Sequence, residues 1–308
     1  MDELINAKTL MLLEEINATL VYASRNGYVW LMELLLRNGA DVNASEGGRT
    51  ALMQAVDRDK AKAVKLLIES GASLDMKDRN GIDALIAAAM KYEVNTDIVK
   101  MLVESGAKVD QRDSQERTAL WGLAGFGDTE LVKLIIAKGA EVDRKDSSRM
   151  TPLMRASRNG HVGVIELLLK NGADVNASEK NGRTSLMWAA TKNRMEATRF
   201  LMENGANIDQ QSSLGRTALM FAAAHNNPDV VKLLLSCNSN AFIKDKENRT
   251  AYDIAKYRKH DVVAELLPDL KTVGIKYQEG KGALRRLKRD IPASERKTRY
   301  HMREQRGL

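Results

Sequence analysis

Apolar residues fall along this chain in short clusters separated by polar segments. One cluster, "RTSLMWAATKN" from residue 183, is followed by "EATRFLMENG" from residue 196. Both clusters place apolar residues three and four positions apart, the spacing of an amphipathic helix. The first opens at Thr184, a residue type that caps helix N-termini, and the second ends at Gly205, where left-handed backbone favours glycine. The pattern predicts a pair of short helices.

The helix-pair pattern recurs along most of the chain. Its markers are a leucine series and a glycine series, and both show the same two-residue excess near "KYEVNTD". The leucine positions are Leu20, Leu52, Leu85, Leu120, Leu153, Leu186 and Leu219, with Tyr252 in the eighth place, and from Leu120 onward they are 33 residues apart. A single helix pair cannot bury its apolar face, so the period predicts stacked repeats.

The period, "TPLM" at residues 151–154, and "NGHVGVIELLLKNGADVNA" at 159–177 together resemble the ankyrin repeat. The resemblance implies an all-α solenoid of helix pairs with β-turn fingers, whose first helices line a concave groove. It covers residues 17–267 as seven repeats and a degenerate eighth. Residues 1–16 are predicted to form a capping helix, and residues 268–308 a basic extension that is helical or disordered.

The residue after the repeat leucine departs from the family pattern. The family usually has His there, whereas this chain has Met53, Met154, Met187 and Met220. Methionine is an adaptable apolar side chain without a hydrogen-bond donor. We expect these residues to pack between neighbouring repeats.

Helix geometry selects candidate ligand-binding residues. The position two after the leucine lies about 200° around the helix, so Trp188 and Phe221 are predicted to lie side by side, exposed on the groove. The alternative is a narrow groove in which the two rings only pack on each other. With the basic positions beside them, the predicted binding residues are Arg155, Arg158, Arg183, Trp188, Lys192, Arg216, Phe221 and His225.

An arginine precedes the capping threonine in most repeats, at Arg49, Arg117, Arg183, Arg216 and Arg249. One interpretation is a structural ladder in which each arginine pairs with an acidic residue of a neighbouring finger, such as Asp113, Asp146, Glu179 or Asp245. The other is a row of bidentate donors for a bound carboxylate or phosphate. The sequence leaves both open.

No pattern in the sequence indicates catalysis, a metal site or a cofactor, so we expect a non-enzymatic protein. The four histidines are not spaced with Cys or carboxylates as zinc ligands would be. The single cysteine, Cys237, indicates a reducing compartment. We expect a cytoplasmic protein without a membrane span, and leave open the nucleus or, from a likeness to microbial ankyrin proteins, the interior of a host cell.

The net charge of +7 is concentrated at the C-terminus, because residues 271–308 carry a net +8 and the rest −1. The tail is interpreted as a cap on the last repeat, an electrostatic binding segment, or a disordered appendage. The whole sequence predicts a monomeric, protein-binding scaffold for an acidic or phosphorylated partner. The alternative is a nucleic acid or similar polyanion, with bases stacked on Trp188 and Phe221. A third possibility is that the repeats address an enzyme carried by another chain.

Overall fold

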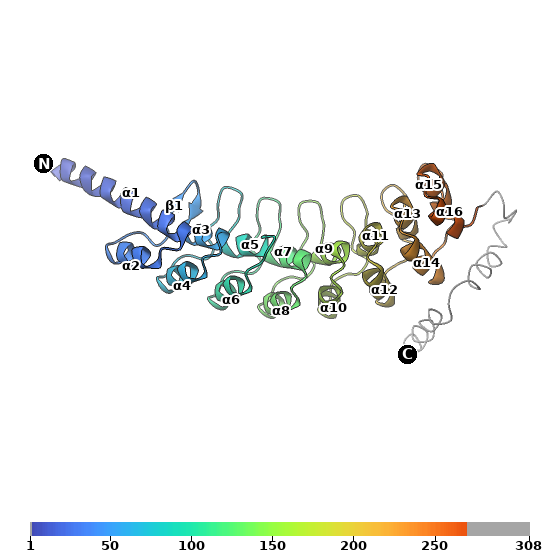
Figure 1. The fold of residues 1–308 in the computed structure, drawn as a ribbon, viewed down its shortest axis with the longest axis horizontal. Coiled ribbons are helices and arrows are strands. Elements are labelled where there is room, and N and C mark those ends of the chain that lie inside the picture. The colour runs from blue at the N-terminus through green and yellow to red at the C-terminus, as the bar shows by residue number, and fades with distance from the viewer. Residues whose placement is uncertain (1, 270–308) are drawn as a thin grey trace. The chain divides into compact units, whose positions relative to one another are not determined.

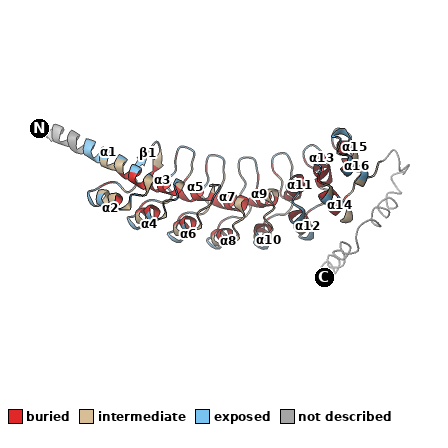
Figure 2. Cartoon of the chain, in the orientation of Figure 1, coloured by how far each residue is buried: buried red, intermediate tan, exposed pale blue. Residues whose placement is uncertain are grey.

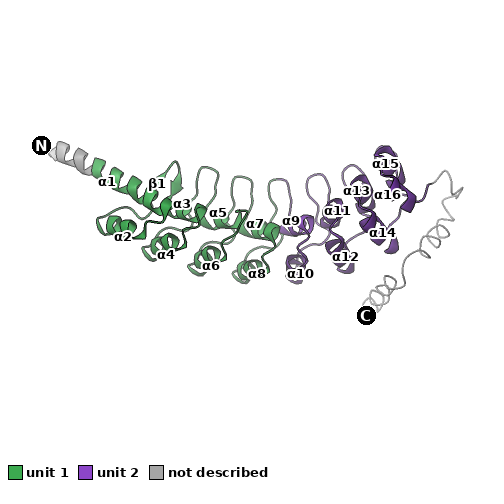
Figure 3. Ribbon diagram, viewed as in Figure 1, with its two compact units in different colours: residues 1–147 green, residues 148–308 purple. Residues whose placement is uncertain are grey.

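The computed structural model describes residues 2–269, with side chains from residue 11 onward. These residues form sixteen helices and one two-stranded sheet, and the chain divides into two compact units, residues 1–147 and 148–308 (Figures 1 and 3). The predicted basic extension, residues 268–308, lies outside the described residues except for its first two.

Unit 1 holds four consecutive helix pairs. The first helices of the pairs pack side by side as one layer, and the second helices as another. The elements are α1 (Asp2–Asn26), α2 (Val29–Arg37), β1 (Ser45–Glu46), β2 (Arg49–Thr50), α3 (Ala51–Asp57), α4 (Ala61–Glu69), α5 (Ala84–Ala89), α6 (Thr96–Glu104), α7 (Ala119–Phe126) and α8 (Thr129–Ala137). The strands β1 and β2 pair antiparallel within the first finger, with Ser45 opposite Thr50.

Unit 2 repeats the same two-layer arrangement. Its elements are α9 (Pro152–Asn159), α10 (Val162–Lys170), α11 (Ser185–Thr191), α12 (Met195–Glu203), α13 (Ala218–Ala224), α14 (Pro228–Ser236), α15 (Ala251–Tyr257) and α16 (Asp261–Leu266). Helix α11 packs against both α9 and α13, so it lies between them in the first layer.

The predicted helix boundaries are confirmed by their capping bonds. The Thr184 side chain accepts a hydrogen bond from the Met187 amide, 3.4 Å away, and the threonines of five other repeats do the same. The third repeat uses Asp83 instead, which accepts from the Ile86 amide at 2.7 Å. Gly205 has the expected left-handed backbone, with φ of +89°. The local sequence therefore sets where each helix starts and stops.

The core lies where the first helices meet their neighbours. Figure 2 shows the buried residues gathered on first helices such as α5, α7 and α13. The four methionines that replace the usual histidine are at most 1% exposed, which confirms their predicted burial. A first helix is covered by its own second helix and by the first helices on either side, so little of its surface reaches solvent.

The predicted N-terminal cap is not a separate helix. Helix α1 runs from Asp2 to Asn26 without a break at the predicted boundary between residues 16 and 17, so one helix supplies both the cap segment and the first helix of the first repeat. The functional boundary between those segments stays a prediction.

Candidate ligand-binding surface

Four of the predicted residues in unit 2 form a continuous stack of guanidinium groups and rings. The guanidinium carbon of Arg158, on α9, lies 5.1 Å from the ring centre of Trp188, on α11. The guanidinium of Arg183, just before the cap of α11, lies 5.0 Å from the same ring and 4.6 Å from the ring of Phe221, on α13. We call Arg158, Trp188, Arg183 and Phe221 the cation–π row. Arg183 lies over both rings and therefore links the two repeats.

The prediction that Phe221 is exposed is wrong. Phe221 is 2% exposed, and Trp188 is only partly buried. The helical wheel places a side chain relative to the core of its own helix pair and ignores the neighbouring repeats. In the stack, the packed first helices and the Arg183 guanidinium cover the Phe221 ring. The Phe221 ring therefore packs against the Arg183 guanidinium and is not exposed for contact with a ligand.

Four of the five recurring arginines take part in the acidic ladder. Arg49 bonds Asp78 of the next finger at 3.2 Å, and Arg117 bonds Asp113 of its own finger at 2.7 Å. Asp245 accepts bonds from both Arg216, at 3.3 Å, and Arg249, at 2.9 Å. Arg49 and Arg216 thus pair with the next finger, as the ladder interpretation requires, whereas Arg117 and Arg249 pair with an aspartate of their own finger.

Asp245 shows what the ladder does to a buried carboxylate. Burial disfavours its charged form, but hydrogen bonds from Arg249 and Arg216 outweigh that effect, so the pKa of Asp245 is lowered. Arg216 also lies 3.9 Å from Glu247. Arg216, predicted as a ligand-binding residue, is thus occupied by two acidic groups of its own protein.

Arg183 is the exception among the five. It forms no ion pair with any carboxylate in the described part of the chain, and neither does Arg158. Their guanidinium faces lie against aromatic rings, and their guanidinium N–H groups have no hydrogen-bond partner among the described residues.

The other predicted residues differ in what they contact. Lys192 is exposed at the C-terminal cap of α11, and its side chain makes no hydrogen bond or ion pair with residues 2–269. His225, also exposed, donates from Nδ1 to the Phe221 carbonyl at 2.9 Å. Arg155 is half-buried on α9. The structure thus places Lys192 and His225 at the ends of the helices that carry the cation–π row.

Basic residues that follow the first helices of other repeats make structural contacts with the neighbouring repeat. The Lys91 ammonium donates to the Asp57 carbonyl at 3.1 Å, and Arg258 donates to the Ala224 carbonyl at 3.2 Å. Each side chain binds a carbonyl group at the end of the preceding first helix, which a helix leaves without an internal partner.

The repeats of this chain identify the family to which it belongs. A family model described as ankyrin repeats matches the chain in three copies, over residues 20–113, 120–212 and 186–278. The chain belongs to the ankyrin-repeat family. Ankyrin repeats indicate a protein-interaction scaffold, and the family is typically non-enzymatic.

Two curated ankyrin proteins are similar to part of the chain. One is the ankyrin repeat and KH domain-containing protein mask-1 of Caenorhabditis elegans, 37% identical over 76 residues, which is 24% of this chain and 3% of that protein. The other is the ankyrin repeat domain-containing protein SAT10 of Stachybotrys chartarum, 41% identical over 68 residues, 22% of this chain and 4% of that protein.

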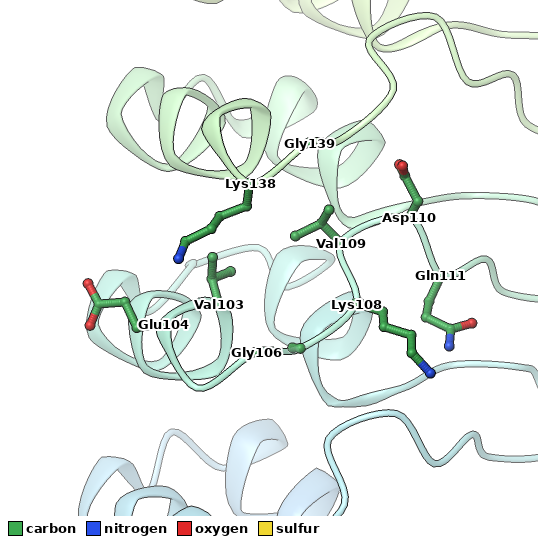
Figure 4. Close-up of a pocket in the computed structure, with 10 residues that line it drawn as sticks. Val103, Glu104, Gly106, Lys108, Val109, Asp110, Gln111, Lys138 and Gly139 are labelled. Atoms are coloured by element: carbon green, nitrogen blue, oxygen red, sulfur yellow. The ribbon is translucent and has the colours of Figure 1, made fainter.

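A shallow hollow of about 680 Å³ lies in unit 1 between two ankyrin repeats (Figure 4). Its walls are the ends of α6 and α8 and the segment after α6, with Glu104, Lys108 and Lys138 at its edge. Lys108 is 3.0 Å from Asp75 of the preceding finger. Gly106 and Gly139, which follow the ends of α6 and α8, also line the hollow and have left-handed backbone.

The described residues form neither a cluster of potential metal ligands nor a membrane-spanning helix. None of their histidines, cysteines and carboxylates gather in threes as metal ligands would. No helix within residues 2–269 has the length and apolar character needed to cross a membrane.

Proposed function

We propose that unit 2 is a non-catalytic scaffold that binds an acidic or phosphorylated segment of another protein at the cation–π row. The observation that carries the proposal is the state of Arg158 and Arg183. Both lie against aromatic rings, and neither is paired with a carboxylate in the described structure. The other four ladder arginines already have acidic partners.

The rings prepare the two arginines for an anion. A guanidinium presents five N–H donors around its edge in a planar fork that matches a carboxylate or phosphate. Ring contact covers its face, leaves those edge donors available, and is worth about 0.5–1 kcal/mol at a partly exposed site. Because the side chains are already held in place, less rotamer freedom is lost when a ligand binds.

The two guanidinium groups also define the dimensions of the surface. Each guanidinium carbon is about 5 Å from the centre of the Trp188 ring, so the two are at most about 10 Å apart. Two guanidinium groups at that distance can each bind an anionic group on the same short peptide segment. Lys192, at the end of the same helix α11, adds a positive charge that is unpaired within the described part of the chain.

Base stacking, which the polyanion alternative required, has less support. A base needs an open ring face, but Phe221 is 2% exposed and two guanidinium groups lie over Trp188. The acidic or phosphorylated protein segment is therefore the ligand that this surface favours.

The proposal is tested with a fluorescently labelled phosphoserine peptide library, a glutamate-containing library, their neutral counterparts, and a single-stranded oligonucleotide. Anisotropy is measured for wild type, Arg183→Gln, Arg183→Lys and Arg216→Gln. We expect wild type to prefer an anionic peptide and Arg183→Gln to lose about tenfold or more in affinity, the equivalent of at least about 1.4 kcal/mol. Arg183→Lys should also weaken binding, since an ammonium has no fork.

Arg216→Gln is the matched control, because it removes the same charge from the next repeat where the arginine is already paired. Asp245 keeps Arg249 as a partner in that variant. Equal losses for Arg183→Gln and Arg216→Gln would show that only net charge matters. Preference for the oligonucleotide, with a steep loss of affinity in added salt, would favour the polyanion alternative.

A further inference from the structure

The fingers of five repeats have the same backbone loop conformation. In the finger of Asp245, the Asp245 amide bonds the Arg249 carbonyl at 2.9 Å, and the Asn248 amide bonds the Asp245 carbonyl. The same two bonds close the fingers that begin at Asp78, Asp113, Glu179 and Ser212. Since the backbone is alike, differences in side-chain pairing between fingers come from the side chains themselves.

An aspartate at the first position of this loop captures arginines. One oxygen of Asp245 accepts from the Glu247 and Arg249 amides, at 2.9 and 3.0 Å. That bonding directs its other oxygen toward the arginine four residues on and toward Arg216, which is 29 residues earlier. Asp113 and Asp78 accept the same pair of amides within their own fingers.

Glu179 occupies this position in the finger beside Arg183 and does not capture it. One Glu179 oxygen accepts from the Asn181 side chain at 3.2 Å. The other is buried without a hydrogen-bond partner, although the residue is only 6% exposed. The extra methylene carries the carboxylate away from the two loop amides that hold an aspartate.

Ser212 occupies the position at which a second acidic partner for Arg183 would lie. It lies 29 residues after Arg183, the separation that joins Arg49 to Asp78 and Arg216 to Asp245. The Ser212 hydroxyl accepts from the Arg216 amide at 3.2 Å and has no charge to offer Arg183. Both ladder partners are thus missing for one arginine.

We infer that Glu179 and Ser212 are specificity-determining positions: by failing to pair with Arg183, they keep its donors available for an acidic or phosphorylated ligand. The inference rests on the proposed function of the cation–π row. It identifies the two residues that leave Arg183 without an acidic partner and so make it available for a ligand. Neither residue has to touch the ligand.

The test restores the ladder without altering the cation–π row. Ser212→Asp and Glu179→Asp each place a carboxylate at a register that captures an arginine elsewhere in the chain. Ser213→Asp is the control, because it adds the same charge one residue away at an exposed position. Binding of the phosphoserine and glutamate libraries is measured by anisotropy. Pairing is measured separately, by urea unfolding of Ser212→Asp with and without Arg183→Gln.

We expect Ser212→Asp and Glu179→Asp to reduce affinity about tenfold or more while Ser213→Asp changes it much less. Ser212→Asp should raise the urea midpoint in wild type but not in the Arg183→Gln background, which shows that the new carboxylate pairs with Arg183.

Two results would overturn the inference. One is coupling between residues 212 and 183 without loss of peptide binding, and the other is equal loss in all three aspartate variants. If wild type binds no anionic peptide, the proposed function fails as well, while the unfolding cycle still reports whether residue 212 controls Arg183.

Discussion

Asp83 is a buried carboxylate at a position where other repeats have threonine, and we predict that Asp83→Thr stabilises unit 1 at neutral pH. Asp83 is 1% exposed and caps α5. Burial disfavours its charged form and outweighs the bond from the Ile86 amide, which raises the pKa of Asp83 to about 6. A threonine keeps the cap, as at Thr118, where the hydroxyl accepts from the Trp121 amide.

The magnitude follows from the pKa. A rise from 3.8 to about 6 corresponds to about 3 kcal/mol for keeping the folded carboxyl charged above pH 6. The sign is fixed by the direction of the shift: a raised pKa favours folding below about pH 4, and that contribution is lost as the pH rises through 6. Removing the carboxyl should therefore stabilise the protein by about 1–3 kcal/mol at pH 7 and by little near pH 4.

The assay is urea unfolding of the full chain between pH 4 and pH 8, followed by circular dichroism. Hydrogen exchange of the Ile86 amide reports on α5 itself. Thr118→Asp, the reverse change in the next repeat, is the matched control and should be destabilising at pH 7, with a penalty that shrinks toward pH 4. A gain for Asp83→Thr that is equal at pH 4 and pH 7, or a loss at pH 7, would refute the reasoning.

Three further predictions concern single contacts. Phe221→Ala should lower the free energy of unfolding by about 3–5 kcal/mol in urea titrations, because a buried ring is removed from the core; a loss below 1 kcal/mol would contradict its burial. Gly122→Ala should cost about 1–3 kcal/mol and lower the melting temperature, since an added Cβ would lie 2.4 Å from the Ala89 carbonyl oxygen; an unchanged melting temperature would argue against that close approach. Asp245→Asn should destabilise the protein at pH 7, and because the pKa of Asp245 is lowered, the penalty should fade as the pH falls below about 4; a penalty independent of pH would exclude the ion pairs as its cause.

Local sequence was enough to predict the repeat. The capping bond at Thr184 and the left-handed backbone at Gly205 follow from interactions within one helix or one turn. Because each repeat uses the same residues for the same contacts, the 33-residue period predicted eight helix pairs and their order.

The geometry of the proposed binding surface was predicted less completely, because it depends on contacts between repeats. The helical wheel selected Trp188 and Phe221 but did not show that α13 packs so closely that Phe221 is buried. The Arg183 guanidinium comes from a finger, and its position over both rings follows from how adjacent repeats stack.

Glu179 and Ser212 were missed for a related reason. Their signal in the sequence was a departure from aspartate in the finger register, but acidic Glu179 looked like a suitable ladder partner. The Glu179 side chain is one methylene longer than that of Asp245. Only the tertiary structure shows that this extra length takes the carboxylate away from the loop amides.

The sequence alone determined the fold, the helix caps and much of the apolar core, since these depend on period, residue type and short-range hydrogen bonds. The tertiary structure decided which arginines are paired and which aromatic rings are covered. Those outcomes depend on distances of a few ångströms between side chains of different repeats. Arg183 illustrates both contributions. The repeat pattern of the sequence predicts its position, whereas the residues that the stacked repeats place beside it leave it without an acidic partner in the described structure.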